Sequence, residues 1–332
     1  SAAASGWGIP TATDIAFAVG ILSILGDRVP VSLKVFLTAL AIADDLIAIL
    51  VVALFYGGTI NFGLLSIAFV LIALVLLMNK LGEKRGWFYL VPAIAIWSLF
   101  YYAGIHSTMS GVVMAFLVPM TPRFNEAYFH RKRLQYIRRL NEYNGIASTS
   151  SEFPNGPQRH CLRRLSAISR DSIGMSYRLE HALGPWVNFL IMPIFALANA
   201  GVEIPDVSYF NVFQFDQVLG SVSMGIFLGL VLGKPLGISL ASFIAVKLHV
   251  GEMPAKSTWP MLIAVACLGG IGFTMSIFVD TLSFGDQTPE VMARLRDMGK
   301  VAVLMGSLCA GILGSVLINI IHGIESRKAV KA

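Results

Sequence analysis

The sequence has 332 residues, of which 56% are hydrophobic and only 13% are charged. A soluble domain is about 45–50% apolar and about 25% charged, so this composition excludes a soluble enzyme, a disordered chain and a disulfide scaffold, and it predicts an all-α polytopic membrane protein. The formal net charge of +6 equals the excess of eleven Lys/Arg over five Asp/Glu within residues 121–181, which indicates one basic segment rather than a nucleic-acid-binding surface.

Apolar runs long enough to cross a bilayer predict nine membrane spans. We place them at residues 9–26, 31–55, 62–79, 87–103, 104–120, 182–200, 218–246, 258–280 and 300–322. The fourth and fifth form one apolar stretch, which we divide at Ala103–Gly104 because a hairpin suits its length better than a single helix. The predicted organisation is therefore spans one to five in residues 1–120, a basic insert at 121–181, and spans six to nine with a short tail in 182–332.

Loop charges predict the orientation of these spans. Alternate loops on one side carry 21 Lys/Arg residues and the loops on the other side carry three. The positive-inside rule then places the C-terminus and the 121–181 loop in the cytoplasm. Residue 1 faces outside, although the chain opens on SAAASGWGIP with no signal-peptide pattern. We therefore expect further spans to precede this sequence.

The basic insert contains two kinds of sequence. Residues 123–140 mix aromatic side chains with Arg and Lys, a pattern that predicts contact with anionic lipid. Residues 144–157 (NGIASTSSEFPNGP) are typical of a flexible linker. The alternative for the whole insert is a solvated cytoplasmic loop with no partner, which the positive-inside rule alone also explains.

Charged residues inside the predicted spans are the strongest functional signal. They are three acids, Asp14, Asp44 and Asp45, and one cation, Lys234. Each costs about 2.5–3.5 kcal/mol at a span centre, and one lysine cannot neutralise three carboxylates. We therefore predict that they face an aqueous cavity, where carboxylate oxygens bind small cations such as Na⁺ or Li⁺, or protons. The alternative is an internal salt bridge that only locks helices together.

Two of the predicted spans are interrupted. In the first, Pro10 and the two threonines after it favour extended backbone, and helix resumes from about Ile15. Asp14 is then expected at a half-helix N-terminus, where a negative charge is favoured. In the span at 258–280, the glycines of LGGIGFTMS interrupt the helix. Broken hydrophobic segments in the two halves of a chain are typical of the ion site of a transporter.

Four motifs, in the same order, resemble the NhaA-type Na⁺/H⁺ antiporters of bacteria. They are GWGIPTATDIAFAVG, KVFLTALAIADDLIAI, LGKPLGIS and GGIGFTMSIF, and the likeness runs from residue 6 to about 322 apart from an insert at 121–178. The resemblance implies an antiporter fold with inverted repeats and two broken, crossing helices. Members of this family are among the transporters from which the rule on broken helices was drawn, so the midplane location of the site follows from the resemblance.

The resemblance also implies an activity and a location. It implies exchange of Na⁺ or Li⁺ for H⁺ by alternating access, regulated by pH, across the bacterial inner membrane. The transported ions are then the ligands, and we expect no cofactor. The family has twelve spans and forms homodimers, and by this comparison the first three spans, with the hairpin used for dimerisation, are absent here. Dimerisation is therefore not carried over.

Residue roles follow from the same resemblance. It implies that Asp45 is the main cation ligand and that Asp44 is a second carboxylate, which either binds the cation or pairs with Lys234. Thr13 and Asp14 are expected where the broken helices cross, with Asp14 offsetting positive half-helix ends and Lys234 offsetting negative ones.

Four further residues match positions linked to pH response. They are His106 and a cytoplasmic cluster of Arg178, Glu180 and His181. A lone histidine in a span is also compatible with a buried polar contact, and that alternative stays open for His106.

Two other functions are compatible with aspartates inside spans. An intramembrane enzyme would use two aspartates on separate helices or a DDxxD motif that holds Mg²⁺, but the pair here reads DDLIA and no second aspartate-rich motif occurs. A cation channel needs rings of carbonyls or charges, whereas one charged cluster with two broken helices favours a transporter. We therefore expect a transporter and not an enzyme.

Overall fold

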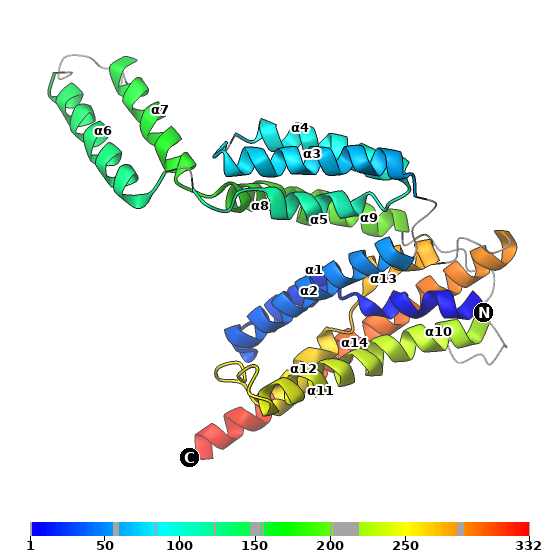
Figure 1. Ribbon diagram of the computed structural model, residues 1–332. Helices are drawn as coiled ribbons and strands as arrows, with labels where there is room; N and C mark the ends of the chain where they lie inside the picture. Colours follow the sequence, from blue (N-terminus) through cyan, green and yellow to red (C-terminus); the bar gives the residue numbers. More distant parts are fainter. Residues whose placement is uncertain are drawn as a thin grey trace. The chain divides into compact units, whose positions relative to one another are not determined.

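The computed structural model describes residues 2–55, 60–83, 85–122, 124–146, 154, 156–199, 201, 219–283 and 289–331, and the regular elements in these ranges are all helices (Figure 1). The chain divides into two units. Unit 1 consists of Ser1–Gly57 and Ile191–Ala332, and unit 2 consists of Gly58–Leu190. Each unit is described by itself.

The apolar pattern located the membrane-spanning helices. Within the described residues, six stretches are long and apolar enough to cross a membrane: Gly6–Arg28, Val31–Ala53, Phe62–Lys80, Met175–Asn199, Val222–Lys247 and Arg294–Arg327. A bent pair, Trp259–Leu268 with Phe273–Ser283, makes a seventh, and the two remaining predicted spans are the shorter apolar helices Trp87–Ala103 and Thr108–Leu117. The predicted all-α membrane fold is confirmed.

Unit 1 combines the beginning and the end of the chain. Its first part contains η1 (Ala2–Thr11), α1 (Ile15–Leu25), η2 (Gly26–Arg28) and α2 (Val31–Phe55). Its second part contains α9 (Met192–Asn199), α10 (Leu219–Leu228), the π-helical turn η5 (Gly229–Gly233), α11 (Lys234–Lys247), α12 (Trp259–Leu268), α13 (Phe273–Ser283) and α14 (Pro289–Lys331). Helix α14 packs along α10, α12 and α13, while η1 contacts α2, α10 and α13 (Figure 1).

Two buried apolar clusters show how the broken spans cross. One cluster joins α1 and α2 to α12 and α14, and includes Leu22, Leu37 and Leu268. The other joins η1 to α10, α13 and α14, and includes Ile9 and Ile277. The two halves of each broken span therefore belong to different clusters: η1 packs with α13, and α1 shares its cluster with α12. This arrangement is the predicted crossing of two broken helices.

The first break is shorter than the sequence predicted. Only residues 12–14 are non-helical, and Asp14 is the N-cap of α1 as expected. The prediction that Pro10 and Thr11 are extended is wrong, because both lie in the last turn of η1. The Thr11 hydroxyl donates to the Gly8 carbonyl at 2.6 Å, so its polar group is satisfied within the turn.

The second break lies at residues 269–272, where the axes of α12 and α13 meet at a bend of 50°. Close packing explains the glycines there. A Cβ on Gly270 would collide with the carbonyl oxygen of Leu230, and a Cβ on Gly272 would collide with the hydroxyl of Ser276. The predicted interruption is confirmed, and the neighbouring backbone leaves no room for a side chain.

Unit 2 contains α3 (Phe62–Lys80), α4 (Trp87–Ala103), α5 (Thr108–Leu117), α6 (Glu126–Ile146), α7 (Gly156–Asp171) and α8 (Met175–Trp186), and the π-helical turn η3 (Val187–Ile191) begins in it. Helices α3, α4 and α5 pack around a buried cluster that includes Tyr89 and Ile96. Gly104 ends α4 with a left-handed φ of 81°, which most side chains disfavour. The boundary predicted at Ala103–Gly104 is thereby confirmed.

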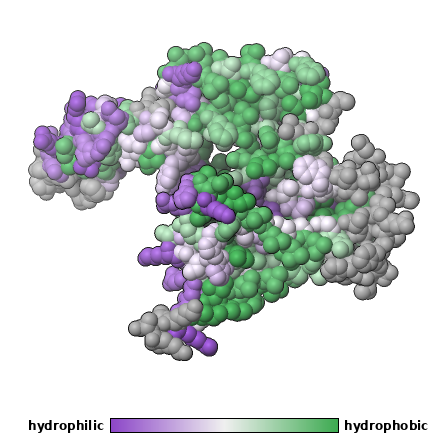
Figure 2. All heavy atoms as spheres, turned by 60° about the horizontal axis from the view of Figure 1, so that its bottom comes forward, coloured by the Kyte–Doolittle hydropathy of each residue, from purple (hydrophilic) through white to green (hydrophobic). Residues whose placement is uncertain are grey.

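Most of the described part of the basic insert is helical. Helices α6 and α7 pack on each other, and Figure 2 shows hydrophilic residues gathered over them, in contrast to the hydrophobic cover of the spanning helices. Most of the predicted linker at 144–157, namely residues 147–153 and 155, lies outside the described residues. Helix α8 begins at Met175 rather than at 182, because its first turns carry charged residues that the apolar pattern excluded.

The prediction that only three acids lie inside spans is wrong. Asp280 is on α13 with 0% of its surface exposed. Lys300 was counted among the three loop cations of one side although it is the first residue of the span predicted at 300–322, and it lies inside α14, which begins at Pro289. Both errors have one cause: a charged residue near the edge of an apolar run was taken as the end of the span, although the helix continues through it.

The packing at the second break predicts a difference between two glycine substitutions. Gly270→Ala should destabilise the protein by roughly 1–3 kcal/mol, because the added methyl meets a backbone carbonyl that cannot turn aside. Gly237→Ala, on an exposed part of α11 with no atom within 4 Å of the added Cβ, should be neutral or stabilising by about 0.5–1 kcal/mol. Thermal unfolding of the purified variants checks this, and equal unfolding temperatures would contradict the packing argument.

Candidate ion-binding site

An ion pair lies at the centre of unit 1. Asp44 is in the middle of α2 and Lys234 is the first residue of α11. The Lys234 Nζ is 2.6 Å from Asp44 Oδ2, with the two side chains 10% and 21% exposed. At this depth each charge is poorly hydrated, so each depends on the other for compensation. The structure therefore brings together two of the intramembrane charges on which the sequence analysis depended.

Thr13 connects this pair to both breaks. It is fully buried in the first break, and its hydroxyl accepts a hydrogen bond from Lys234 Nζ at 2.6 Å. Its oxygen is also 2.9 Å from Asp44 Oδ2 and 2.8 Å from the carbonyl oxygen of Gly269, at the C-terminus of α12. Since a hydroxyl has one hydrogen, it donates to one of these two acceptors at a time.

Asp14 caps two helices at once. Its Oδ1 accepts from the backbone N–H of Phe17 in α1 at 3.2 Å, and its Oδ2 accepts from the backbone N–H and the hydroxyl of Thr274 in α13, at 3.0 and 2.6 Å. The Asp14 N–H donates to the Ile271 carbonyl at 2.6 Å. One carboxylate therefore satisfies the N-terminal ends of both second half-helices, where the helix dipoles favour negative charge.

Asp45 differs from its neighbour in lacking a protein donor. Its Oδ1 is buried and has no hydrogen-bond partner within the described part of the chain. The charged groups that act on it are Asp14, Lys234 and Asp44. Consecutive helical residues point about 100° apart, so the Lys234 contact made by Asp44 does not extend to Asp45. A buried carboxylate oxygen without a donor is suited to bind a cation or a proton.

The donor set suits a weakly held, hard cation. Among the described residues, no group of three or more His, Cys, Asp and Glu side chains is arranged to hold a metal ion. The polar atoms at the crossing are carboxylate, hydroxyl and carbonyl oxygens, together with one ammonium group. Oxygen ligands of this kind bind alkali and alkaline-earth cations rather than transition metals.

The residues expected to take part in pH response belong to unit 2 and not to the unit that holds the ion site. His106 lies in the turn between α4 and α5, with its Nδ1 2.9 Å from the Thr108 hydroxyl. Burial lowers the pKa of the His106 imidazole from its ordinary value near 6.5, which favours the neutral ring.

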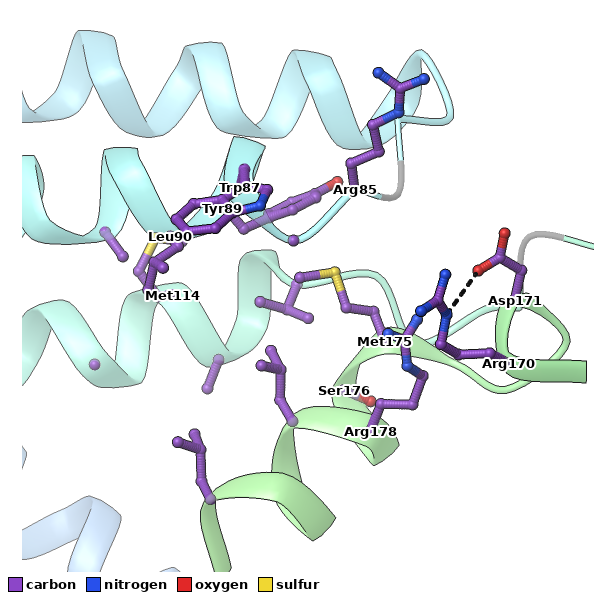
Figure 3. A pocket seen from close by; sticks show the side chains of 17 residues that line it. Arg85, Trp87, Tyr89, Leu90, Met114, Arg170, Asp171, Met175, Ser176 and Arg178 are labelled. Atoms are coloured by element: carbon purple, nitrogen blue, oxygen red, sulfur yellow. Dashed lines mark ion pairs between the residues drawn. The ribbon is translucent and has the colours of Figure 1, made fainter. Parts of the chain in front are cut away.

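The cluster predicted from Arg178, Glu180 and His181 lies on α8. Glu180 and His181 are exposed, and the His181 ring lies 4.0 Å from the ring of Tyr177. Arg178 lines a cavity of about 830 Å³, as do two further arginines at its edge, Arg85 and Arg170 (Figure 3). Three guanidinium groups repel a small cation, so the electrostatics of this cavity disfavour a cation site.

Sequence reasoning missed the partners that hold the breaks together. Thr274 is the donor to Asp14, and the carbonyl oxygens of Gly269 and Ile271 accept from Thr13 and Asp14. All three partners lie in or beside the LGGIGFTMS motif. Their roles were not visible because the contacts join residues more than 250 positions apart, and only the crossing of the two breaks brings them together.

Comparison with known proteins gives a consistent result. The profile of the family described as Na⁺/H⁺ antiporter 1 matches residues 1–318. The chain is 40% identical to the Na⁺/H⁺ antiporter NhaA of Syntrophobacter fumaroxidans, covering 94% of this chain and 64% of that protein. It is 39% identical to the NhaA of Bacteroides thetaiotaomicron, covering 99% of this chain and 71% of that protein. It is 37% identical to the NhaA of Shigella dysenteriae, covering 93% of this chain and 65% of that protein. The chain thus spans about two thirds of the length of these relatives.

Because Asp14 caps two helices, its substitution should lower the free energy of unfolding more than the loss of a single helix cap does. Asp14→Ala removes acceptors from the ends of two helices and should destabilise the protein by about 2–5 kcal/mol, because bonds to a charged acceptor in a buried place are lost. Asn61→Ala is the matched control: Asn61 caps α3 alone, at an exposed position, and should cost about 1 kcal/mol. Chemical denaturation in detergent measures both, and similar losses would show that Asp14 does not bridge the two helices.

Because Asp44 and Lys234 form an ion pair, the effects of substituting them on stability should not add. Lys234→Gln leaves Asp44 without its ammonium partner and should destabilise the protein by about 3 kcal/mol. Adding Asp44→Asn removes the unpaired charge and should recover most of this loss. Lys247→Gln, at the exposed end of α11, serves as the control and should have little effect. A double variant no more thermostable than Lys234→Gln would exclude a stabilising pair.

Proposed function

Because this chain belongs to the Na⁺/H⁺ antiporter 1 family, we propose that it exchanges Na⁺ for H⁺ across a membrane, with Asp44 and Asp45 as the ion-binding carboxylates. The observation that carries this proposal is the buried oxygen of Asp45, which has no donor among the described residues and lies one residue from the Asp44–Lys234 pair. The protein is accordingly a transporter and not an enzyme.

Charge balance supports competition between the two ions. The crossing contains the carboxylates Asp14, Asp44 and Asp45 but only one ammonium group, that of Lys234. The excess negative charge is lowered by a bound cation or by a proton on a carboxylate, and one carboxylate cannot hold both. Na⁺ arriving at Asp45 therefore displaces a proton, and a proton arriving there displaces Na⁺. This mutual exclusion is the coupling that exchange requires.

The two breaks support alternating access as the transport mechanism. Non-helical backbone is tolerated at membrane depth only where its polar groups are satisfied. Here Asp14 and Thr13 satisfy them through side-chain contacts that join the two broken spans. Such contacts can be exchanged as the half-helices tilt, whereas a continuous helix has no comparable joint. We propose that movement of the half-helices around the crossing opens the site to each side in turn.

The finer features of the proposal rest on chemistry and charge. Oxygen ligands do not exclude Li⁺, and we propose that Li⁺ is exchanged as well as Na⁺. The loop charges support a location in the bacterial inner membrane with the C-terminus and the 121–181 loop in the cytoplasm. We attribute pH regulation mainly to competition at Asp44 and Asp45, with His106 and the Arg178, Glu180 and His181 cluster as modifiers.

Anionic lipid is the proposed partner of the 121–181 segment. Arg170 and Arg178 lie at the edge of the unit 2 cavity, whose interior is lined by apolar residues such as Leu90 and Met114 (Figure 3). Arg170 lies 3.8 Å from Asp171 and Arg85 lies 3.8 Å from Glu83, which leaves the guanidinium group of Arg178 for an external anion. Guanidinium groups beside an apolar cavity suit a phosphate headgroup with its acyl chain.

The site assignment predicts loss of exchange on removal of one carboxylate. Asp45→Asn should abolish Na⁺-driven proton movement in proteoliposomes while the protein still inserts and folds, because removing a charge from a span makes insertion easier. Asp27→Asn removes an exposed carboxylate outside the site and should leave exchange unchanged. A pH-sensitive dye inside the vesicles reports the flux, with K⁺ as the inactive ion. Near-normal exchange by a folded Asp45→Asn variant would disprove the assignment.

Competition also predicts how Na⁺ affinity depends on pH. The apparent KM for Na⁺ should fall as pH rises, by about tenfold per pH unit for each proton displaced while the site is mostly protonated. Burial lowers the pKa of His106 and favours its neutral ring, so this histidine contributes little to the change in KM as pH rises. His106→Ala should therefore leave the KM profile between pH 7 and 9 in place. A flat profile in the unsubstituted protein would rule out direct competition, and a profile lost only in His106→Ala would assign the switch to the histidine.

A further inference from the structure

A second buried carboxyl group lies on α13, outside the proposed ion site. Asp280 is 0% exposed, and neither of its oxygens has a hydrogen-bond partner in the ranges that the structure describes. Asp14 is buried almost as deeply but accepts three hydrogen bonds, from Phe17 and Thr274. Two buried carboxyl groups of the same unit thus differ: Asp14 accepts hydrogen bonds, and Asp280 has no donor within the described part of the chain.

The Asp280 carboxyl packs directly against the backbone of α14. A Cβ added to Gly299 would collide with Asp280 Oδ1, so the missing side chain of this glycine provides the space for the carboxyl group. Ser276, Asp280 and Ser283 follow one another at four and three residues, so they share one face of α13, and all three are buried. The carboxyl group is therefore enclosed between two helices.

The charged groups that act on Asp280 are all on α14, and they are Arg296, Asp297 and Lys300. The other elements packed on α13 are η1, α9 and α2. Neither η1 nor α9 contains a charged residue, and the charges of α2 are Lys34 and the two aspartates of the ion site. The electrostatic balance of Asp280 is thus set by one stretch of α14.

Lys300 is the cation with the largest electrostatic effect on Asp280, yet it is bonded elsewhere. It is 8% exposed, and its Nζ donates to the carbonyl oxygen of Gly201 at 2.9 Å. The Nε of Arg296 is buried and has no partner among the described residues. No N–H or O–H from these cations therefore reaches the carboxyl oxygens. An ionised carboxylate in this position would be shut off from bulk solvent and would have no donor among the described residues to stabilise it.

We propose that Asp280 is a second proton-binding site, which holds a proton in this conformation and releases it when Lys300 exchanges the Gly201 carbonyl for the carboxylate. In the release step the O–H bond of the carboxyl group breaks, and the proton passes to water. The carboxylate that remains pairs with the ammonium group, which keeps its own protons throughout. This inference does not depend on exchange at Asp44 and Asp45, because it concerns the protonation of a separate residue.

The infrared absorption of a protonated carboxyl group tests the first part. In membranes at neutral pH, the protein should show a C=O band of a buried carboxylic acid that is absent from Asp280→Asn. Asp297→Asn is the matched control, since it removes an acid of the same helical stretch and should keep the band. Asp45→Asn should also keep it, which separates this result from failure of the proposed exchange. Absence of any Asp280-dependent band would overturn the proposal.

The role of Lys300 is tested by titrating that band. It should disappear as pH is raised, and in Lys300→Gln the midpoint should move upward by at least one pH unit, a tenfold gain in proton affinity, because the carboxylate has lost its ammonium partner. A band that does not titrate, or an unchanged midpoint in Lys300→Gln, would overturn the exchange with Lys300.

A further variant covers the case in which Asp280→Asn does not fold. Gly299→Ala places a methyl group against Asp280 Oδ1 and should shift the frequency of the band without removing it. A band whose frequency is unchanged in Gly299→Ala does not come from Asp280, and this result would overturn the assignment. Retention of secondary structure by circular dichroism confirms that each variant is folded before its spectrum is compared.

Discussion

A helix that stops inside a membrane leaves backbone N–H and C=O groups at the break, where no lipid can bond them. Two such breaks meet in unit 1, and side chains bond the backbone groups that the breaks leave free. Asp14 accepts from the first turns of both α1 and α13, and Thr13 bonds the carbonyl of Gly269 at the end of α12. The free-energy cost of placing these charges inside the membrane is therefore offset by the hydrogen bonds that they make at the breaks. They are what allows two interrupted helices to cross, and the candidate ion site is built from the same residues.

The three carboxylates at the crossing differ in their hydrogen bonding, and this difference supports the proposed ion ligand. The Asp14 carboxylate accepts hydrogen bonds from helix N-termini, and the Asp44 carboxylate is bonded to Lys234 and Thr13. Asp45 retains a buried oxygen without a donor among the described residues. A structural salt bridge alone would account for Asp44 and Lys234 but not for a third carboxylate left unbonded beside them. The alternative of a purely locking role is therefore weaker than that of a site whose last ligand is a transported ion.

Much of this arrangement could be predicted from the sequence, for identifiable physical reasons. Apolar run length located the spans and predicted the hairpin at Ala103–Gly104, and Asp14 was expected at a half-helix N-terminus. The roles of Asp44 and Asp45 came from resemblance to a family, since spacing alone does not distinguish them. Thr274 was not found, because its contact with Asp14 exists only in the folded crossing. Asp280 was missed because a single acid near the end of an apolar run is indistinguishable from a loop residue until burial is known.

Helix α13 connects the two groups of charges in unit 1. Its first turn holds Thr274, which is bonded to Asp14 at the crossing, and Asp280 lies six residues further along, about 9 Å at 1.5 Å per residue. Where Asp280 meets α14, the residue opposite it is Gly299, which has no side chain. Small residues let helix backbones approach closely and leave no interlocking side chain that would oppose sliding. A short helix is stiff over two turns, so a displacement at the crossing is carried to Asp280, where it changes the distance between the carboxyl group and α14. The proton on Asp280 and the contacts of the crossing are thus mechanically linked through a single half-helix.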